Sequence, residues 1–272
     1  MRLLVLSKRQ YTGKDLLDDR YGRLYEIPLT LAGRGHEVLG VALSYRTRAE
    51  GWQQRQDCPR LRWYSINATP QGLLRYPSRL AKIVRSFQPD LIWACSDAPH
   101  ALIGWALKGR LHRPLVIDLY DNFESFGVTR LPGLKSLLRA ACRGADGLTL
   151  VSHTLDDYVA ANYGVTAPRM VIGNAVPENL FLPLDRYAAR ERLGLPARAR
   201  LVGTAGAICA DRGIADLFTA FERLARNDHD LWLVHAGPHD TTPAQYRHPR
   251  IIDLGILPHE AVPHLFSALD VA

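Results

Sequence analysis

Polar side chains follow two of the apolar segments in the first half of the sequence. Asp97 and His100 come after the segment that contains Trp93. The segment after Pro114 carries the larger group, which consists of Asp118, Tyr120, Asp121 and Asn122. Ligands of α/β proteins bind at the carboxyl ends of parallel strands, so these groups are candidates to line one ligand cleft. Asp97 and His100 also have structural alternatives, because Asp97 can cap a helix and His100 can be a surface side chain.

The segments that would position these side chains alternate between two patterns. Short runs rich in Val, Leu and Ile alternate with amphipathic stretches, which is typical of βαβ units around a parallel sheet. Strands are predicted at residues 2–7, 37–43, 60–66, 91–95, 115–119, 147–151 and 170–172. Helices are predicted at residues 22–33, 72–87, 98–108, 134–143 and 154–163. Pro28 lies inside the first of these helices and is expected to bend or loosen it.

A polar connection between residues 175 and 200 predicts a boundary between two domains, because Pro177, Pro183 and Pro196 punctuate it. We therefore expect a first α/β domain over residues 1–176, a linker over 177–199 and a second α/β domain over 200–272. The second domain should contain strands at 201–207, 231–236 and 251–254, helices at 214–226 and 260–268, and a strand that starts at residue 269. Such a sheet leaves an apolar face uncovered at its open end, so we expect this domain to be incomplete.

Several classes of function lack their signatures. The sequence contains no GxxxxGK[ST] phosphate loop, no GxSxG nucleophile motif and no GxGxxG after the first strand. His235 and His239 are four residues apart, but Gly237 and Pro238 lie between them, so no metal site is expected. The net charge of +7 includes no Lys/Arg-rich run, which argues against nucleic acid. Widely spaced cysteines, with no signal peptide or membrane span, predict a reduced, cytoplasmic protein.

A series of short motifs runs through the sequence in a defined order. In chain order these are residues 31–38 (LAGRGHEV), 89–93 (PDLIW), 114–121 (PLVIDLYD), 145–152 (ADGLTLVS), 169–176 (RMVIGNAV), 203–208 (GTAGAI), 211–221 (DRGIADLFTAF), 233–238 (LVHAGP), 253–256 (DLGI) and 268–271 (ALDV). In this order and spacing the sequence resembles the GT-B glycosyltransferases of family 4. The resemblance implies an α/β fold of two Rossmann-like domains, with the acceptor bound mainly by the first and a nucleotide-sugar donor by the second. It also implies retention of anomeric configuration, no obligatory metal and no cofactor.

The resemblance implies a donor site on the second domain at Gly206, Arg212, Gly213 and Gly237. Arg212 and Gly213 stand where family members usually carry a Lys-Gly pair at a helix start. Helix N-termini and cations stabilise the diphosphate that leaves during transfer, although a solvated arginine is the alternative. Ala207 departs from the family, which usually has Arg here, and Asn174-Ala175 replaces the usual Asn-Gly pair.

The resemblance places the acceptor against the first domain. Relatives often carry a His or an Arg-Asp pair after the strand at 115–119, so Tyr120 and Asp121 are the expected catalytic pair. Asn122, Asp97 and His100 are expected to contact the acceptor beside them. Asp18 and Asp19 stand where many relatives have a Gly-Gly pair near the phosphates. Two carboxylates there would repel a diphosphate unless screened; the alternatives are contacts to acceptor hydroxyls or a plain surface loop.

Two predicted helices of the first domain combine apolar and basic side chains. The helix at 72–87 carries Arg75, Arg79, Lys82 and Arg85, and the helix at 134–143 carries Lys135 and Arg139. Family members that modify lipid-linked sugars often dock on anionic membranes through such helices. The alternative is an ordinary amphipathic helix with a core face and a solvated charged face. We expect a cytoplasmic protein that can make peripheral contact with the inner face of the membrane.

The expected function is that of a retaining glycosyltransferase. It would move a hexose-type sugar from a nucleotide donor to a glycan or lipid-linked acceptor, as in synthesis of cell-envelope polysaccharide. Relatives carry an E-x7-E segment in the later part of the second domain, and this sequence lacks it, so we expect the chain alone to be inactive. A non-catalytic binding or scaffold protein, completed by a partner chain, is the main alternative, favoured by Ala207 and the Asp18-Asp19 pair. A basic peripheral membrane protein without sugar chemistry is a third.

Overall fold

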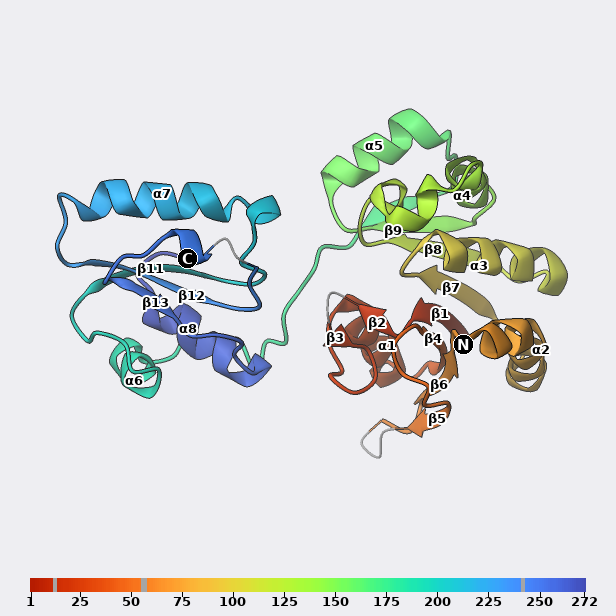
Figure 1. Ribbon diagram of the computed structural model, residues 1–272. Coiled ribbons are helices and arrows are strands. Elements are labelled where there is room, and N and C mark those ends of the chain that lie inside the picture. The colour runs from red at the N-terminus through yellow and green to blue at the C-terminus, as the bar shows by residue number, and fades with distance from the viewer. Residues whose placement is uncertain (12–13, 55–57, 241–242) are drawn as a thin grey trace. The chain divides into compact units, whose positions relative to one another are not determined.

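The computed structural model describes residues 1–11, 14–54, 58–240 and 243–272. The chain divides into two compact units, Met1–Ala175 and Val176–Ala272. Each unit is an α/β layer structure around its own parallel sheet, which confirms the predicted fold class (Figure 1). Among the helices of the described residues, none has the length and apolar character needed to cross a bilayer.

The first unit is built on an eight-stranded sheet with the order β10-β9-β8-β7-β1-β4-β6-β5. Its strands are β1 (Arg2–Lys8), β4 (Glu37–Ser44), β5 (Gly51–Gln54), β6 (Leu61–Asn67), β7 (Leu91–Cys95), β8 (Leu115–Leu119), β9 (Gly147–Leu150) and β10 (Arg169–Val171). β5 runs antiparallel to β6 and all other neighbours in this sheet are parallel. A short hairpin of β2 (Gln10–Tyr11) and β3 (Lys14–Asp15) follows β1.

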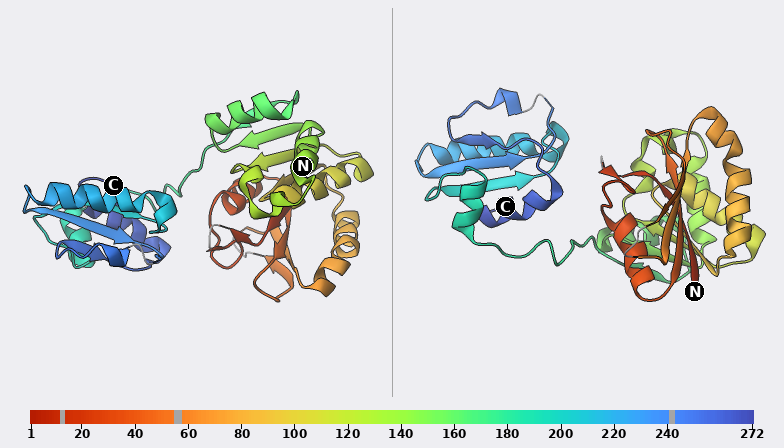
Figure 2. Two further views of the ribbon diagram at one scale, coloured as in Figure 1. Left: turned by 45° about the horizontal axis from the view of Figure 1, so that its top comes forward. Right: turned by 90° about the horizontal axis from the view of Figure 1, so that it is seen from below.

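Five α-helices cover this sheet, namely α1 (Arg23–Gly33), α2 (Pro70–Phe87), α3 (Ala98–Leu111), α4 (Leu134–Arg143) and α5 (His153–Tyr163). Alternate strand residues point to opposite faces, so Leu4 and Leu6 join the core with α2 and α3, whereas Leu3 and Val5 face α1. The right-hand view of Figure 2 shows α1 on one face of the sheet and α2 and α3 on the other. Two 3₁₀ turns, at Phe123–Ser125 and Gly127–Arg130, connect β8 to α4.

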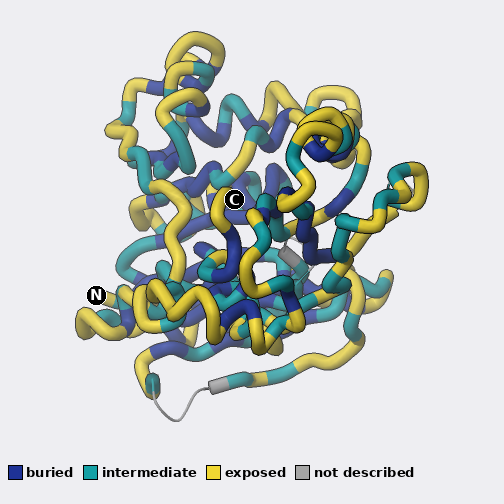
Figure 3. The backbone as a smooth tube through the Cα atoms, turned by 90° about the vertical axis from the view of Figure 1, so that its left-hand side faces the viewer, coloured by how far each residue is buried: buried dark blue, intermediate teal, exposed yellow. Residues whose placement is uncertain are grey.

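The second unit has three parallel strands in the order β11-β12-β13, at Arg200–Ala205, Leu231–Ala236 and Ile251–Asp253. α7 (Ile214–Ala225) covers one face, and α6 (Arg186–Arg192) and α8 (Val262–Ala268) cover the other (Figure 1). Short 3₁₀ turns occur at Ala210–Arg212, Pro243–Gln245 and His259–Ala261. In both units the longest buried runs are strands, and the connections carry most of the exposed residues (Figure 3).

The predicted strands and helices are confirmed in type and order, with ends that move by a few residues. The structure adds β5, the β2–β3 hairpin and α6, which the sequence analysis did not predict. The strand expected from residue 269 is reduced to a single parallel bridge between Val271 and Val202. Pro28 is accommodated inside α1.

α6 lies within the stretch that was expected to be only a linker, and a buried arginine fixes it to the second unit. Arg190 is 3% exposed and donates to the carbonyl oxygens of Ala197, Ala199 and Ala268 at 2.8–3.0 Å. Its guanidinium also lies 2.9 Å from Asp270 Oδ2, which accepts the backbone N–H of Leu201 as well. One side chain therefore joins α6, the start of β11 and the end of α8.

We expect Arg190→Met to destabilise the second unit by about 3–5 kcal/mol, because it strands a paired carboxylate and several buried carbonyl oxygens. Hydrogen exchange followed by mass spectrometry should show faster exchange in β11 and β12 and unchanged exchange in β1 and β4. Arg192→Met, at an exposed position of the same helix, is the matched control and should change exchange little. Equal exchange in the two variants would contradict the prediction.

Candidate functional site

The carboxyl ends of β1, β7 and β8 meet at one edge of the first sheet, and the polar side chains identified in the sequence lie there. The three strands are neighbours in the order β8-β7-β1. Lys8 ends β1, Asp97 follows β7, and Tyr120 follows β8. Because ligands of parallel sheets bind at this edge, the first unit offers its candidate site here.

Asp97 caps α3, and His100 belongs to the same buried network. The Asp97 carboxylate accepts the backbone N–H of His100 at 3.1 Å and lies 2.6 Å from His100 Nδ1. The His100 ring is fully buried, which excludes the surface position considered for it. Burial opposes the charge of Asp97, but His100 and Lys8 attract it, and the net pKa of Asp97 lies below its usual value.

The turn after β8 presents Tyr120, Asp121 and Asn122. Tyr120 is half-buried, and its ring packs against Phe123 and Phe126 with centroid distances of 5.4 and 6.2 Å. Asn122 accepts the backbone N–H of Glu124 at 3.1 Å and so begins the first 3₁₀ turn. The Asp121 side chain is exposed. Of the expected catalytic pair, the phenol ring is held by packing and the carboxylate faces solvent.

A buried glutamate anchors this turn to the two helices that follow it. Glu124 accepts hydrogen bonds from Arg139 of α4 at 2.6 and 3.0 Å and from the Tyr158 hydroxyl of α5 at 3.0 Å. The hydrogen bond from Arg139 holds the pKa of Glu124 below its usual value. Nothing in the sequence analysis singled out Glu124, because its partners lie 15 and 34 residues away.

Asp18 and Asp19 lie in the loop that follows the β2–β3 hairpin, and both carboxylates accept hydrogen bonds from the protein. Arg9, which is 2% exposed, donates to the carboxylates of Asp15 and Asp18, each at 2.8 Å. The Asp19 carboxylate accepts the backbone N–H of Asp15 at 2.6 Å. The arginine therefore neutralises part of the negative charge that this pair brings to the loop. Thr12 and Gly13, between β2 and β3, lie outside the described residues.

Asp118 differs from its neighbours because it is completely buried. Its carboxylate accepts two hydrogen bonds from Arg23 of α1, at 2.7 and 3.2 Å, and one from the Thr149 hydroxyl at 2.6 Å. Burial raises the pKa of Asp118 although Arg23 opposes the shift. Arg23 also donates to the carbonyl oxygen of Ile172 and to the Asn174 side chain. Asp118 is thus a structural anchor beneath the turn.

In the second unit, the ends of β11 and β12 approach each other at two glycines. A side chain at Gly237 would place its Cβ 1.8 Å from the carbonyl oxygen of Gly206. Both glycines have positive φ, 141° and 144°, which favours glycine at these positions. Gly213, with φ 70°, directly precedes α7, and the Arg212 side chain beside it is exposed without an ion-pair partner among the described residues. The predicted donor residues thus lie at strand ends and at a helix start.

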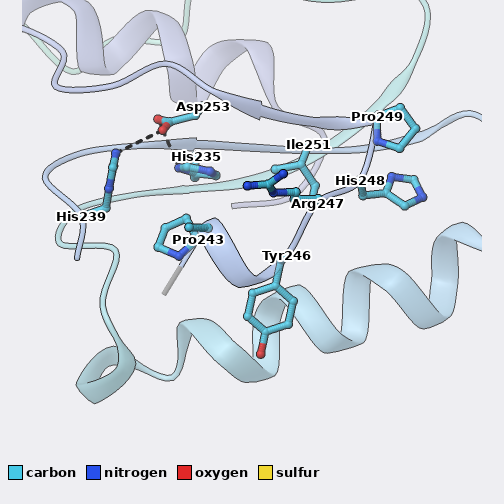
Figure 4. Close-up of a pocket in the computed structure, with 10 residues that line it drawn as sticks. His235, His239, Pro243, Tyr246, Arg247, His248, Pro249, Ile251 and Asp253 are labelled. Carbon is cyan, nitrogen blue, oxygen red and sulfur yellow. Dashed lines mark ion pairs between the residues drawn. The ribbon is translucent and has the colours of Figure 1, made fainter. Parts of the chain in front are cut away.

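A pocket of about 590 Å³ lies beside β13 of the second unit (Figure 4). His235, His239 and Asp253 line one end, where the Asp253 carboxylate lies 3.4 Å from His235 Nδ1 and 3.3 Å from His239 Nε2. Burial lowers the pKa of His235 although Asp253 attracts the charged form. His239 also forms a parallel bridge with Ile208, which lies two residues after Gly206. The described residues contain no group of three or more His, Cys, Asp or Glu placed to hold a metal ion.

We expect Glu124→Gln to lower the free energy of unfolding by about 1–2 kcal/mol at pH 7, because charge-assisted hydrogen bonds to Arg139 are lost. The folded-state pKa of Glu124 is depressed from 4.5, so its contribution is present above that value and is lost as the pH falls through the folded-state pKa. Urea unfolding at pH 7 and at about pH 3 should therefore show that the difference in free energy of unfolding between the wild type and Glu124→Gln becomes smaller in acid. Glu37→Gln, at an exposed pair 3.9 Å from Arg60, is the control. A difference that stays constant with pH would contradict this role.

Comparisons with known proteins bear on both units. The solved structure of sucrose-phosphate synthase from Thermosynechococcus elongatus is similar with a TM-score of 0.76 and 16% identity over 99% of this chain and 74% of that chain. HepE from Anabaena in complex with UDP-glucose has a TM-score of 0.66 and 21% identity over 99% and 72% of the two chains. Trehalose 6-phosphate synthase from Burkholderia multivorans has a TM-score of 0.61 and 15% identity over 98% and 74%. No curated protein matches the sequence.

The fold of these structures is GT-B, and the chain shares it, as the sequence motifs predicted. A family model described as Glycosyltransferase Family 4 matches residues 23–180, which include α1, most of the first sheet and the Tyr120–Asn122 turn. The chain belongs to glycosyltransferase family 4.

Proposed function

We propose that the protein transfers a sugar from a nucleotide-sugar donor to a glycan or lipid-linked acceptor, with retention of anomeric configuration. The observation that carries the proposal is the close approach of Gly206 and Gly237 at the ends of two strands, in a family 4 chain whose α7 begins directly after Arg212 and Gly213. HepE in complex with UDP-glucose, which shares the fold, supports a nucleotide sugar as the donor.

The donor diphosphate is proposed to bind at the carboxyl edge of the second sheet. The N-terminus of α7 supplies backbone N–H groups and the positive end of its dipole, and Arg212 supplies a guanidinium. The two glycines carry no side chain that would hinder a phosphate from approaching the backbone, and at Gly237 a Cβ would collide with the Gly206 carbonyl oxygen. The pocket beside His239 and Asp253 then offers space for the nucleoside.

The acceptor is proposed to bind at the carboxyl edge of the first sheet. Tyr120 and Asp121 offer a phenol and a carboxylate to acceptor hydroxyls, with Asn122 beside them. During transfer an acceptor oxygen forms a bond to the anomeric carbon while the bond from that carbon to the diphosphate breaks. The negative charge that develops on the diphosphate is stabilised by the helix N-terminus and Arg212.

A non-catalytic binding protein is the second candidate. Ala207, which is exposed and carries no charge where family members usually have Arg, favours it. The Asp18-Asp19 pair favours it less, because Arg9 binds the Asp18 carboxylate. A binding protein would hold the sugar nucleotide without consuming it, so transfer and binding must be measured separately.

Peripheral membrane contact in the cytoplasm is also proposed, through the start of α2. Leu73 and Leu74 are 48% and 84% exposed there, next to the exposed Arg75. An apolar pair beside a basic side chain suits insertion among anionic headgroups. Arg79 of the same helix is already paired with Glu50, so it is not counted among the available cations.

We expect Leu74→Glu to reduce sedimentation of the protein with phosphatidylglycerol vesicles at least about threefold, because apolar insertion is lost and a like charge is added. The control is Leu224→Glu on α7, where the replaced leucine is 61% exposed. Vesicles of phosphatidylcholine should bind neither form. Equal sedimentation of the two variants with anionic vesicles would rule out this surface.

We expect Arg212→Ala to weaken binding of the preferred sugar nucleotide about tenfold or more, because one charge-assisted hydrogen bond to the diphosphate is lost. Calorimetry with UDP-, GDP- and ADP-glucose should first identify that donor. Arg212→Lys should retain most of the affinity, since the charge is kept.

The matched control is Arg226→Ala, which removes the same charge from an exposed position at the other end of α7. Its affinity should stay within about twofold of the wild type. Failure of all three nucleotides to bind, or an equal effect of the two alanine substitutions, would refute the proposed donor site. Detectable transfer to a sugar acceptor would exclude the second candidate.

A further inference from the structure

Lys8 holds a central place at the edge of the first sheet. It is the last residue of β1, which lies between β4 and β7. Its backbone N–H donates to the Ser96 hydroxyl at 2.9 Å, which ties the end of β1 to the turn that follows β7. No role for this lysine was predicted from the sequence.

The backbone at this contact is held in an uncommon conformation. Ser96 is fully buried and has φ of 88°, a left-handed value that non-glycine residues rarely adopt. Its hydroxyl lies 3.2 Å from His100 Nδ1 as well as accepting from Lys8. Such strain persists only where the surroundings fix it, and it occurs often at binding and catalytic sites. The end of β1 is therefore set in position before any ligand arrives.

The Lys8 side chain is half-buried, and no residue that the structure describes forms an ion pair with it. Its Nζ lies 5.7 Å from the ring centroid of Tyr120 and 5.2 Å from that of Phe126. No carboxylate among the described residues lies within salt-bridge distance of it. Burial lowers the pKa of Lys8, while Asp97 and Asp121 act in the opposite direction from farther away. The aromatic faces attract the ammonium but leave its N–H donors without an anionic acceptor.

We propose that Lys8 binds an anionic group, a phosphate or a carboxylate, on the acceptor sugar. The ammonium lies beside the Tyr120–Asn122 turn, so an anion on Lys8 would place the sugar ring against that turn. A neutral sugar would leave the partly desolvated ammonium without a counter-charge, whereas an anionic sugar would supply one. Lys8 is thus a specificity-determining residue, and this inference rests on the proposed acceptor side of the first unit.

Of the two carboxylates whose charges act on Lys8, Asp97 is buried against His100 and Asp121 is the exposed one. Its carboxylate is exposed and its charge acts on Lys8 from beyond salt-bridge distance. Removal of that carboxylate should strengthen anion binding at Lys8, because one repulsive charge disappears. This outcome distinguishes a lysine that binds a ligand anion from one that only compensates the negative charge of Asp121.

The test compares glucose, glucose 6-phosphate and glucuronate by calorimetry on the full chain, without any nucleotide. The wild type should bind at least one anionic sugar about tenfold or more tightly than glucose. Lys8→Met should bring the ratio of the affinity for the anionic sugar to that for glucose close to one. Lys8→Arg should restore part of this ratio. Lys82→Met, at an exposed position of α2, is the control and should leave the ratio unchanged. Asp121→Asn should raise the ratio.

A lipid source of the phosphate is tested in a separate arm with phosphatidic acid and phosphatidylcholine vesicles. Binding of phosphatidic acid that is lost in Lys8→Met, without binding of soluble sugars, assigns the anion to a lipid phosphate. If Lys8→Met does not fold, NMR of the wild type with ¹³C-methylated lysines should show the Lys8 signal shifting with the anionic probe. A ratio of one in the wild type without lipid binding, or a ratio that Lys8→Met leaves unchanged, overturns the inference. Since no nucleotide is present, neither result depends on the donor site.

Discussion

The buried pair of Arg23 and Asp118 is the interaction on which the first unit's binding edge depends. It joins the start of α1 to the end of β8, and Thr149 extends it to β9. Removing one partner would leave a charge without compensation in the interior, which typically costs about 3–5 kcal/mol. Because Tyr120 and Asp121 follow Asp118 by two and three residues, this pair also fixes where the polar turn leaves the sheet. The position of this polar turn therefore depends on a pair that is buried beneath it.

Local patterning was sufficient to predict the parallel sheets and most of the helices, because strand and helix segments differ in period and are separated by clear turn signals. It failed at α6, which has seven residues and is rich in arginine. Only Ala189 and Arg190 of this helix are buried. A buried arginine looks in sequence like a solvated one, and its three carbonyl partners and Asp270 become visible only in the folded unit. β5 was missed for a related reason, since a short edge strand lacks the apolar alternation of a central one.

The same limit applies to the candidate site. Residue types next to strand ends could be identified from sequence, which is how Asp97 and Tyr120 were found. Their partners could not, because contacts such as Glu124 with Arg139 and Arg9 with Asp18 depend on how the chain folds back. The Asp18 carboxylate is an example. From the sequence it was expected to repel a diphosphate, but in the structure the buried guanidinium of Arg9 offsets its charge.

The distribution of charge within each unit supports the proposal that the donor binds to the second unit and the acceptor to the first. At the first edge, Asp18, Asp19, Asp97 and Asp121 outnumber the nearby cations Lys8 and Arg9, so a diphosphate with two or more negative charges would be opposed there. A phosphate or carboxylate on an acceptor is proposed to fit this edge only through contact with the Lys8 ammonium. The second unit offers close backbone approach at its glycines, a helix N-terminus, and Arg212, which has no ion-pair partner among the residues the structure describes. On these electrostatic grounds the proposed diphosphate site belongs to the second unit, and the proposed acceptor anion depends on the single cation Lys8.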